Sequence, residues 1–262
     1  MFCDWYFGAI MSFCYDEDMT ELLYMKDFDV EACEAKVVSC AKSENSRMDL
    51  VLDQTCFYAR GGGQDWDQGL IKTDKASFNV DEVHLDEDGV VHHIGSSSGN
   101  LLVDDTVSCE VDHKRRSINS RLHSAAHVID MAVDQLELSW TPGKGQHYPH
   151  LSAIEYSGEL DSEESDKLSK QIETRANELI EKGSINMLRF MSVDEMHTVC
   201  RNVPDNLPKN KPARVVMYGD FGIPCGGTHL KNIKDVGKVI VKKLKNKRGV
   251  IRLSYAVEGI NS

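Results

Sequence analysis

The sequence of 262 residues has no apolar run that approaches the roughly 20 residues needed for a membrane-spanning helix. Its eight cysteines have no CxxC motif and no paired spacing, so we expect seven of them to be buried thiols in a reducing compartment. The first eighteen residues carry no Lys or Arg, unlike secretory signals and transit peptides. These absences predict a cytoplasmic protein with no membrane partner.

Charge is unevenly distributed along the chain, whose composition of 41% hydrophobic and 27% charged residues is ordinary for a globular protein. Residues 1–112 hold 7 Lys and Arg against 24 Asp and Glu, a balance of −17. Residues 113–262 hold 23 against 18, a balance of +5. The first half would therefore repel a phosphate backbone, whereas the second half could meet one.

Short apolar runs separated by turn clusters fill the first half of the chain. Many short strands at close spacing are typical of a small β-barrel or sandwich. We therefore expect a β-barrel-like domain over residues 19–112, preceded by an extension over residues 1–18. The expected strands are Ala35–Cys40, Met48–Leu52, Gly69–Ile71, Ser77–Val83, Val90–Ile94 and Thr106–Val111.

The apolar spacing changes to three and four residues after Asp112, which is suited to cap a helix. A helix of about six turns is expected from there until Pro142 and Gly143 end it in the segment Trp140–Gly143. An α+β domain over residues 113–262 would then complete an α+β fold. Its other expected elements are a helix over Asp161–Glu181, stopped by Gly183, and the strands Arg214–Tyr218, Val236–Leu244 and Val250–Val257.

Two short motifs supply metal-ligand chemistry. His123-Ser-Ala-Ala-His127 lies in the expected long helix, where residues four apart stand one above the other. Cys225-Gly-Gly-Thr-His229 contains two glycines that allow a tight loop to aim a thiolate and an imidazole at one point. One thiolate and three imidazoles suit tetrahedral Zn²⁺, so these four residues are the predicted zinc ligands.

The metal motifs leave alternatives open. An HxxxH pair on a helix is common by chance, and four protein ligands also fit a purely structural zinc. A metalloprotease is disfavoured because the segment Ser124–Ala126 places no Glu beside the first histidine. The other histidines of the second half, His113, His147, His150 and His197, are expected to be ordinary polar or surface residues.

Three segments, in this order, resemble motifs of alanyl-tRNA synthetase editing regions: Asp53–Gln64 (DQTCFYARGGGQ), Arg121–His127 (RLHSAAH) and Arg214–His229 (RVVMYGDFGIPCGGTH). With these motifs the chain resembles the AlaX-type free-standing alanyl-tRNA editing proteins. It departs from them at Ala59, where such proteins usually have proline, and at Asp65-Trp66, which interrupts the usual sequence.

The resemblance implies a zinc-dependent hydrolase that cleaves the ester of mischarged Ser-tRNA(Ala), and sometimes Gly-tRNA(Ala). It implies that the zinc ligands, which are also the candidate catalytic residues, are His123, His127, Cys225 and His229. A threonine that faces the substrate's amino acid in related proteins has its counterpart in Thr141. The glycine-rich segment, which supports editing from the neighbouring domain, adds the candidate substrate-binding residues Gly61, Gly62, Gly63 and Gln64.

The last strands carry a run of basic residues, which is either a solvated hairpin face or a contact for tRNA phosphates. A tRNA partner favours the contact. Two other functions stay open: a deacylase for another mischarged tRNA such as Ser-tRNA(Thr), and a non-catalytic tRNA-binding module with a structural zinc. The sequence identifies no general base and leaves the oligomeric state open. The candidate tRNA-binding residues are Lys242, Lys243, Lys245, Lys247 and Arg248.

Overall fold

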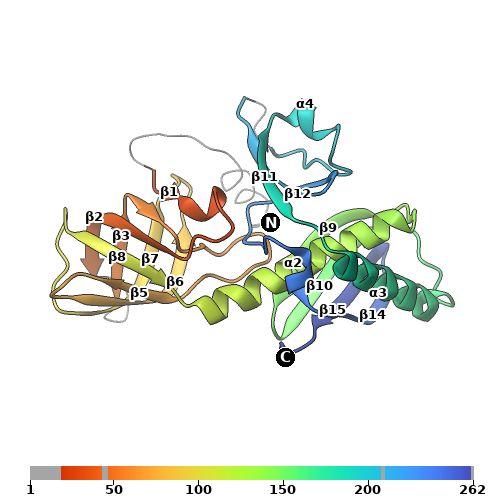
Figure 1. The fold of residues 1–262 in the computed structure, drawn as a ribbon, viewed down its shortest axis with the longest axis horizontal. Helices are drawn as coiled ribbons and strands as arrows, with labels where there is room; N and C mark the ends of the chain where they lie inside the picture. The colour runs from red at the N-terminus through yellow and green to blue at the C-terminus, as the bar shows by residue number, and fades with distance from the viewer. Residues whose placement is uncertain (1–18, 43–46, 208–209, 261–262) are drawn as a thin grey trace.

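The computed structural model describes residues 19–42, 47–207 and 210–260, so the expected extension over residues 1–18 lies outside the described residues. The fold is α+β: a β-barrel occupies one end, and one long helix runs from it into the second half of the chain (Figure 1). Within the described ranges, no helix is long and apolar enough to cross a membrane.

Six antiparallel strands close the barrel in the order β2-β3-β7-β6-β5-β8. Alternate side chains point inward and form an apolar core, and closure leaves no free sheet edge. The six expected strands are all present, and the barrel rather than the sandwich is confirmed. The strands are β2 (Ala32–Lys42), β3 (Met48–Leu52), β5 (Gly69–Lys72), β6 (Ser77–Leu85), β7 (Val91–Ser98) and β8 (Thr106–Val111).

A short segment before the barrel anchors the chain that leads to the glycine-rich motif. Strand β1 (Glu21–Leu22) pairs in parallel with β4 (Gln54–Thr55), and the 3-10 helix η1 (Leu23–Met25) follows it. The ring of Tyr24 is buried edge-on against that of Tyr58, with centroids 5.2 Å apart. This aromatic contact packs the start of the glycine-rich segment against the barrel core.

Helix α2 (His113–Gln135) begins directly after the last barrel strand, and the predicted cap is confirmed. The side chain of Asp112 accepts a hydrogen bond from the backbone N–H of Arg115 at 3.1 Å. This bond satisfies one of the free N–H groups of the first turn. The helix therefore leaves the barrel at a fixed point.

The predicted end of this helix at Trp140–Gly143 is wrong. Leu136 caps α2, and Glu137 turns the chain with a φ of 56°. Pro142 lies instead in β9 (Thr141–Tyr148), which is an edge strand of its sheet. An edge strand tolerates proline because one row of its N–H groups has no partner strand. Pro142 and Gly143, which were expected to end the helix, therefore belong to a strand that follows it.

A four-stranded antiparallel sheet, in the order β14-β15-β10-β9, packs with α2 and α3 around one apolar core. Helix α3 (Ser165–Lys182) ends at Gly183, as predicted, with a φ of 76°. Strand β14 begins at Val239 rather than Val236, because the 3-10 helix η3 (Ile233–Val236) precedes it. The other strands of this sheet are β10 (Leu151–Ser157), β14 (Val239–Lys247) and β15 (Val250–Val257).

A third, smaller sheet lies at the top of the view in Figure 1, in the order β11-β12-β13. Strand β12 (Ala213–Tyr218) is buried along its whole length between β11 (Asn186–Met191) and β13 (Phe221–Pro224), with the short helix α4 (Val193–Met196) beside them. Strand β13 of this sheet ends directly before Cys225. This sheet therefore positions the second metal motif.

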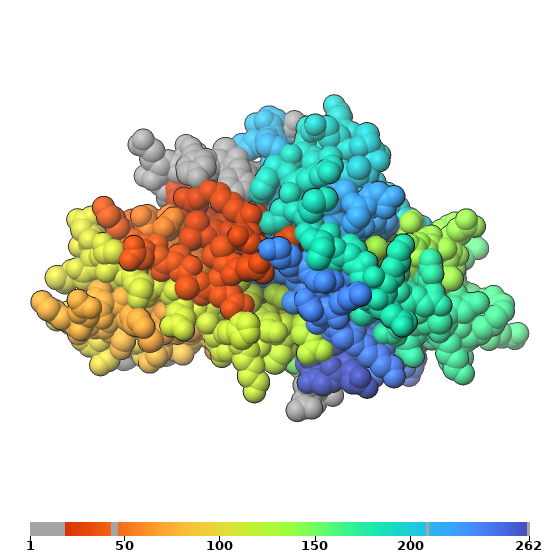
Figure 2. Space-filling model, viewed as in Figure 1, coloured from red at the N-terminus to blue at the C-terminus, as the bar shows by residue number. Residues whose placement is uncertain are grey.

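The barrel and the later part of the chain are in direct contact across the middle of the molecule (Figure 2). One ion pair at this contact joins Lys231 Nζ to Asp29 Oδ2 at 3.2 Å. A second, buried ion pair joins Arg116 of α2 to Asp67 of the barrel region. The two halves of the sequence thus form one packed structure.

Candidate metal centre

Four side chains from the two sequence motifs meet inside the protein. His123 and His127 extend from consecutive turns of α2, and Cys225 and His229 come from the loop after β13. One ligand atom from each lies within 4.8 Å of the other three, and all four residues are at most 7% exposed. The helix spacing and the glycine loop therefore aim all four groups at one point, where they could hold a metal ion.

The hydrogen bonding of this cluster is incomplete in a way that fits a metal ion. Neither ring nitrogen of His127 or His229 has a hydrogen-bond partner, although both rings are buried. Nδ1 of His127 is 3.6 Å from Oδ2 of Asp130, and Nε2 of His123 is 3.3 Å from Sγ of Cys225. Buried polar atoms without partners are rare and costly. A thiolate with three imidazoles is a donor set typical of Zn²⁺, so these residues fit that ion.

The glutamine of the glycine-rich segment fixes the ring of His123. The backbone N–H of Thr228 donates to Oε1 of Gln64 at 3.1 Å, which identifies that atom as the amide oxygen. His123 must then donate from Nδ1 to the same oxygen, at 2.8 Å. Its Nε2 keeps the lone pair and faces Cys225, as a metal ligand requires. The barrel region thus contributes directly to the centre.

The glycine-rich segment needs glycine where it meets β9. Gly63 has a φ of 75°, and a Cβ on it would lie 2.2 Å from the carbonyl oxygen of Gly145. The carbonyl oxygen of Gly63 accepts a hydrogen bond from the backbone N–H of His147 at 2.8 Å. A tight turn, closed by backbone pairing of Gly61 with Gln64, directs the glutamine side chain toward the centre.

A buried arginine supports the loop that carries the thiol. Nη1 of Arg214 donates to the carbonyl oxygens of Cys225 and Gly227, at 2.8 Å each. Burial raises the pKa of the Cys225 thiol, but the nearby His127 and Arg214 outweigh it, and the net pKa is lowered. The surroundings therefore favour the thiolate, which is the form that binds metal.

The expectation that His147 is an ordinary polar or surface residue is wrong. Its ring is buried and stacks on that of His123, with centroids 4.4 Å apart. Nδ1 lies 2.8 Å from Oη of Tyr255, which donates its proton to the carbonyl oxygen of Leu122. Burial lowers the pKa of His147 to about 3, so the ring is neutral. Sequence spacing gave no signal for it, because it lies in a strand that the sequence did not predict.

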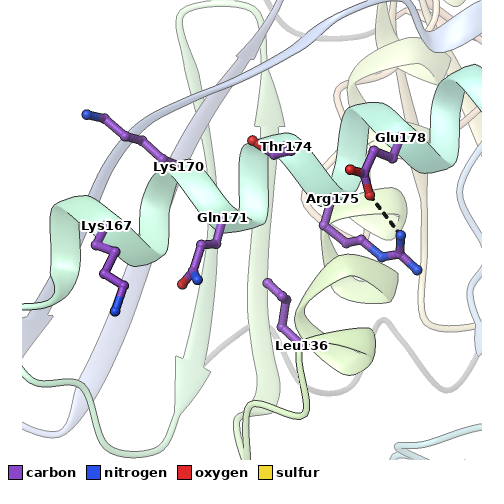
Figure 3. A pocket seen from close by; sticks show the side chains of 7 residues that line it. All are labelled: Leu136, Lys167, Lys170, Gln171, Thr174, Arg175 and Glu178. Atoms are coloured by element: carbon purple, nitrogen blue, oxygen red, sulfur yellow. Dashed lines mark hydrogen bonds and ion pairs between the residues drawn. The ribbon is translucent and has the colours of Figure 1, made fainter.

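The remaining candidates lie elsewhere. Thr141 is exposed at the first residue of β9, and among the described contacts it is His147, six residues further along, that reaches the cluster. The five candidate tRNA-binding residues are all exposed, on β14 and the turn that follows it. A pocket on the outer face of α3, lined by Leu136 and by side chains of residues 167–178, contains none of the predicted site residues (Figure 3).

Replacing Gln64 with leucine should weaken metal binding by about 10- to 100-fold, because the ring of His123 loses the acceptor that orients it. The measurement is a competition titration of the metal against a chelator. Gln68→Leu is the matched control, since within the described part of the chain Nε2 of Gln68 donates to the exposed carbonyl of Asp81, at 2.9 Å, and not to the metal centre. Equal affinities in the two variants would contradict the orienting role of Gln64.

Comparisons with known proteins place the chain among tRNA synthetase and tRNA-editing sequences. Residues 13–115 match the family model for class II (A) tRNA synthetases, and residues 213–254 match that for the second additional domain of threonyl and alanyl tRNA synthetases. The chain is 30% identical to the alanyl-tRNA editing protein AlaX-M of Saccharolobus solfataricus, over 92% of this chain and 100% of that protein.

Two longer proteins are also similar. The alanyl-tRNA editing protein AlaX-L of Pyrococcus horikoshii is 30% identical over 87% of this chain and 56% of its own length. The alanine–tRNA ligase of Sulfurisphaera tokodaii is 34% identical over 90% of this chain, but over only 26% of its own length. Each similarity includes both the barrel and the residues that follow it.

Proposed function

The chain belongs to the AlaX family of alanyl-tRNA editing proteins, and from this premise we propose that it hydrolyses the ester of mischarged Ser-tRNA(Ala) in trans. The observation that carries the proposal is the contact between Gln64 and His123, which joins the glycine-rich motif to the Cys/His cluster. A match over the full length of the alanyl-tRNA editing protein AlaX-M supports editing as the activity of this chain.

We assign the activity to an editing domain over residues 113–262, with the barrel of residues 19–112 as its support. The proposed zinc ligands and catalytic residues are His123, His127, Cys225 and His229, which supply a donor set suited to the ion. Zn²⁺, when bound, supplies Lewis acidity toward an ester. The glycine-rich turn, Gly61 to Gly63, supports this site by holding the side chain of Gln64 against it.

The chain's own residues hold the buried site in one arrangement. Gln64 sets the proton on Nδ1 of His123, and Arg214 pins the carbonyl groups of the thiol loop. The buried ring of His147 stacks on the ring of His123 and supports it. Such fixed groups orient an activated ester without reorganisation during the reaction. Thr141 is proposed to contact the substrate's amino acid, on the family resemblance.

The test is to compare hydrolysis of Ser-tRNA(Ala), Gly-tRNA(Ala), Ala-tRNA(Ala) and Ser-tRNA(Thr) by protein of known zinc content. Rapid loss of serine from tRNA(Ala), with alanine spared, is the expected result. Equal cleavage of Ser-tRNA(Thr) would overturn the assignment to tRNA(Ala). Binding of tRNA with no cleavage of any ester by the zinc-loaded protein would favour a non-catalytic module instead.

The tRNA partner is proposed to lie along β14. Lys243, Lys245 and Lys247 alternate along one exposed face of this strand. The neighbouring Lys243, and to a smaller extent Lys247, lower the pKa of Lys245, so the three charges lie close together. A row of like charges repels itself and is well placed to neutralise phosphates. The other two candidates, Lys242 and Arg248, adjoin this row in the sequence and are also exposed.

The triple variant K243A/K245A/K247A should bind tRNA more weakly, and its binding should depend less on salt. Each lost phosphate contact reduces the slope of log K against log salt by about 1. Binding is measured at several salt concentrations, beside the control K167A/K170A/K182A on α3, which removes the same charge from another exposed face. Equal slopes in the two triple variants would contradict the assignment of β14.

A further inference from the structure

The barrel contains a second group of reactive side chains that the proposed function does not use. Cys33 lies on β2, Cys109 on β8, and Cys56 directly after β4. All three are free thiols within or beside the barrel core, where Cys56 and Cys109 are buried and Cys33 is partly exposed. The arrangement therefore combines one partly exposed cysteine with two buried ones.

Strand register places two of these cysteines directly opposite each other. Cys33 pairs with Cys109 in the antiparallel ladder of β2 and β8. The hydrogen bond from the N–H of Val111 to the carbonyl of Glu31, two residues along each strand, makes Cys33–Cys109 a hydrogen-bonded pair as well. Cα atoms in such pairs are about 5.5 Å apart, within the roughly 4.4–6.8 Å range of disulfides. A bond between the two sulfurs is thus compatible with the existing fold.

The three thiols also differ in acidity. The thiols of Cys109 and Cys56 interact with that of Cys33 and lower its pKa far below the ordinary value. The pKa values of Cys56 and Cys109 are raised, with Cys33 as the largest cause in each case. Cys33 therefore has the character of an attacking thiolate, because accessible thiols of lowered pKa are the ones that oxidants modify.

Such a group of thiols could instead bind a metal ion, but the geometry disfavours a metal site. Among the described residues, the metal centre is the one place where three or more His, Cys, Asp or Glu side chains converge closely enough to hold an ion. The nearby His93 is already satisfied, with Nδ1 3.0 Å from the carbonyl oxygen of Leu50 and Nε2 2.9 Å from Oγ1 of Thr55. The ring of His93 is therefore not free to join the thiols as a ligand of a metal ion.

We propose that Cys33 and Cys109 form a reversible oxidation site, which reacts with hydroperoxides to give a disulfide across β2 and β8. The Cys33 thiolate attacks the peroxide O–O bond, an alcohol or water leaves, and Cys33 becomes a sulfenic acid. The Cys109 thiol then attacks that sulfur, the S–S bond forms, and water leaves. In total the two thiols lose two electrons and two protons, and these reduce the hydroperoxide.

The experiment treats the zinc-loaded full chain with hydrogen peroxide, blocks free thiols by alkylation and digests the protein with trypsin without reduction. Cleavage after Lys and Arg puts Cys33 in peptide 27–36, Cys40 in 37–42, Cys56 in 48–60 and Cys109 in 76–114. The expected product in the mass spectrum is a cross-link between peptides 27–36 and 76–114. Dithiothreitol should remove this cross-link.

Three variants provide the comparison. Cys33→Ser and Cys109→Ser should each abolish the cross-link, whereas Cys40→Ser should retain it. Cys40 is the matched control because it lies on the same strand, is also partly exposed, and has a pKa that burial raises. Alkylation of Cys33 in the unoxidised wild-type protein gives a readout that needs no variant: it should be faster than that of Cys40.

Two outcomes would overturn the proposal. One is a cross-link that joins peptide 27–36 to 48–60, since Cys56 would then be the partner. The other is the conversion of Cys33 to sulfinic or sulfonic acid with no cross-link. Zinc content and deacylation are measured in the same samples and report on Cys225, so a failure of the proposed function is distinguished from a failure of this inference.

Discussion

Cys225→Ala should remove the bound metal and lower the deacylation rate by at least about 100-fold. The thiolate is one of four donors that lie within 4.8 Å of one another, and its loss leaves three imidazoles to hold the ion. Loss of a group that merely orients a metal ligand already costs about 10- to 100-fold in affinity or activity, so loss of a ligand should cost more. Metal content by mass spectrometry and hydrolysis of Ser-tRNA(Ala) measure the two effects.

Cys200→Ala is the matched control for this substitution. Cys200 is also a buried cysteine, but it packs in the small apolar cluster of the β11–β13 sheet. Among the described residues it belongs to no group of side chains that could hold a metal ion. The Cys200→Ala variant should keep both the bound metal and the deacylation activity. Its free energy of unfolding should fall only slightly, because of the cavity that the substitution leaves. Full metal content together with full activity in Cys225→Ala would refute the ligand assignment.

Arg116→Met should lower the free energy of unfolding by about 3–5 kcal/mol, because it leaves the buried Asp67 carboxylate without its counter-charge. The side chains of Arg116 and Asp67 are 3% and 0% exposed. Nε of Arg116 donates to Oδ2 of Asp67 at 2.9 Å, and Nη2 donates to the carbonyl oxygen of Cys56 at 2.7 Å. Denaturant unfolding, monitored by circular dichroism, measures the change.

The neighbouring Arg115→Met is the control, with an expected loss below about 1 kcal/mol. Arg115 pairs with Asp65 at 2.7 Å, but both side chains are more than a quarter exposed. The double variant R116M/D67N should recover part of the loss, because asparagine removes the unpaired charge and still accepts from the N–H of Tyr58. A loss in R116M no larger than that in R115M would contradict a net role for the buried pair.

The Arg116–Asp67 pair also bears on the metal centre. Asp67 follows Gln64 by three residues, and Arg116 precedes His123 by two turns of the same helix. The ion pair therefore fixes the glycine-rich segment against the helix that carries two of the four clustered side chains. For this reason R116M should lose metal affinity as well as stability, whereas R115M should lose little of either.

The local sequence pattern was sufficient to predict the barrel strands and two helix ends. All six barrel strands were predicted from short apolar runs that are separated by turn clusters. The capping residue Asp112 and the stop at Gly183 were also predicted, because both act through their own backbone neighbourhood. Strands β9, β10 and β11 were not predicted. In β9 the reason is local, because Pro142, Gly143 and Gly145 read as a turn.

The sequence by itself determined which donors are available and how each pair is spaced. A separation of four residues in a helix brings His123 and His127 together, and two glycines let Cys225 and His229 share a loop. The two motifs together predicted one ligand set, and the tertiary structure brings the two pairs together. Only the tertiary structure decided that Gln64 sets the proton on His123 and that His147 is buried against it. The physical reason is that propensity and periodicity act over a few residues, whereas these contacts join segments up to about one hundred residues apart. Packing of the whole chain selects such contacts, and no local pattern encodes them.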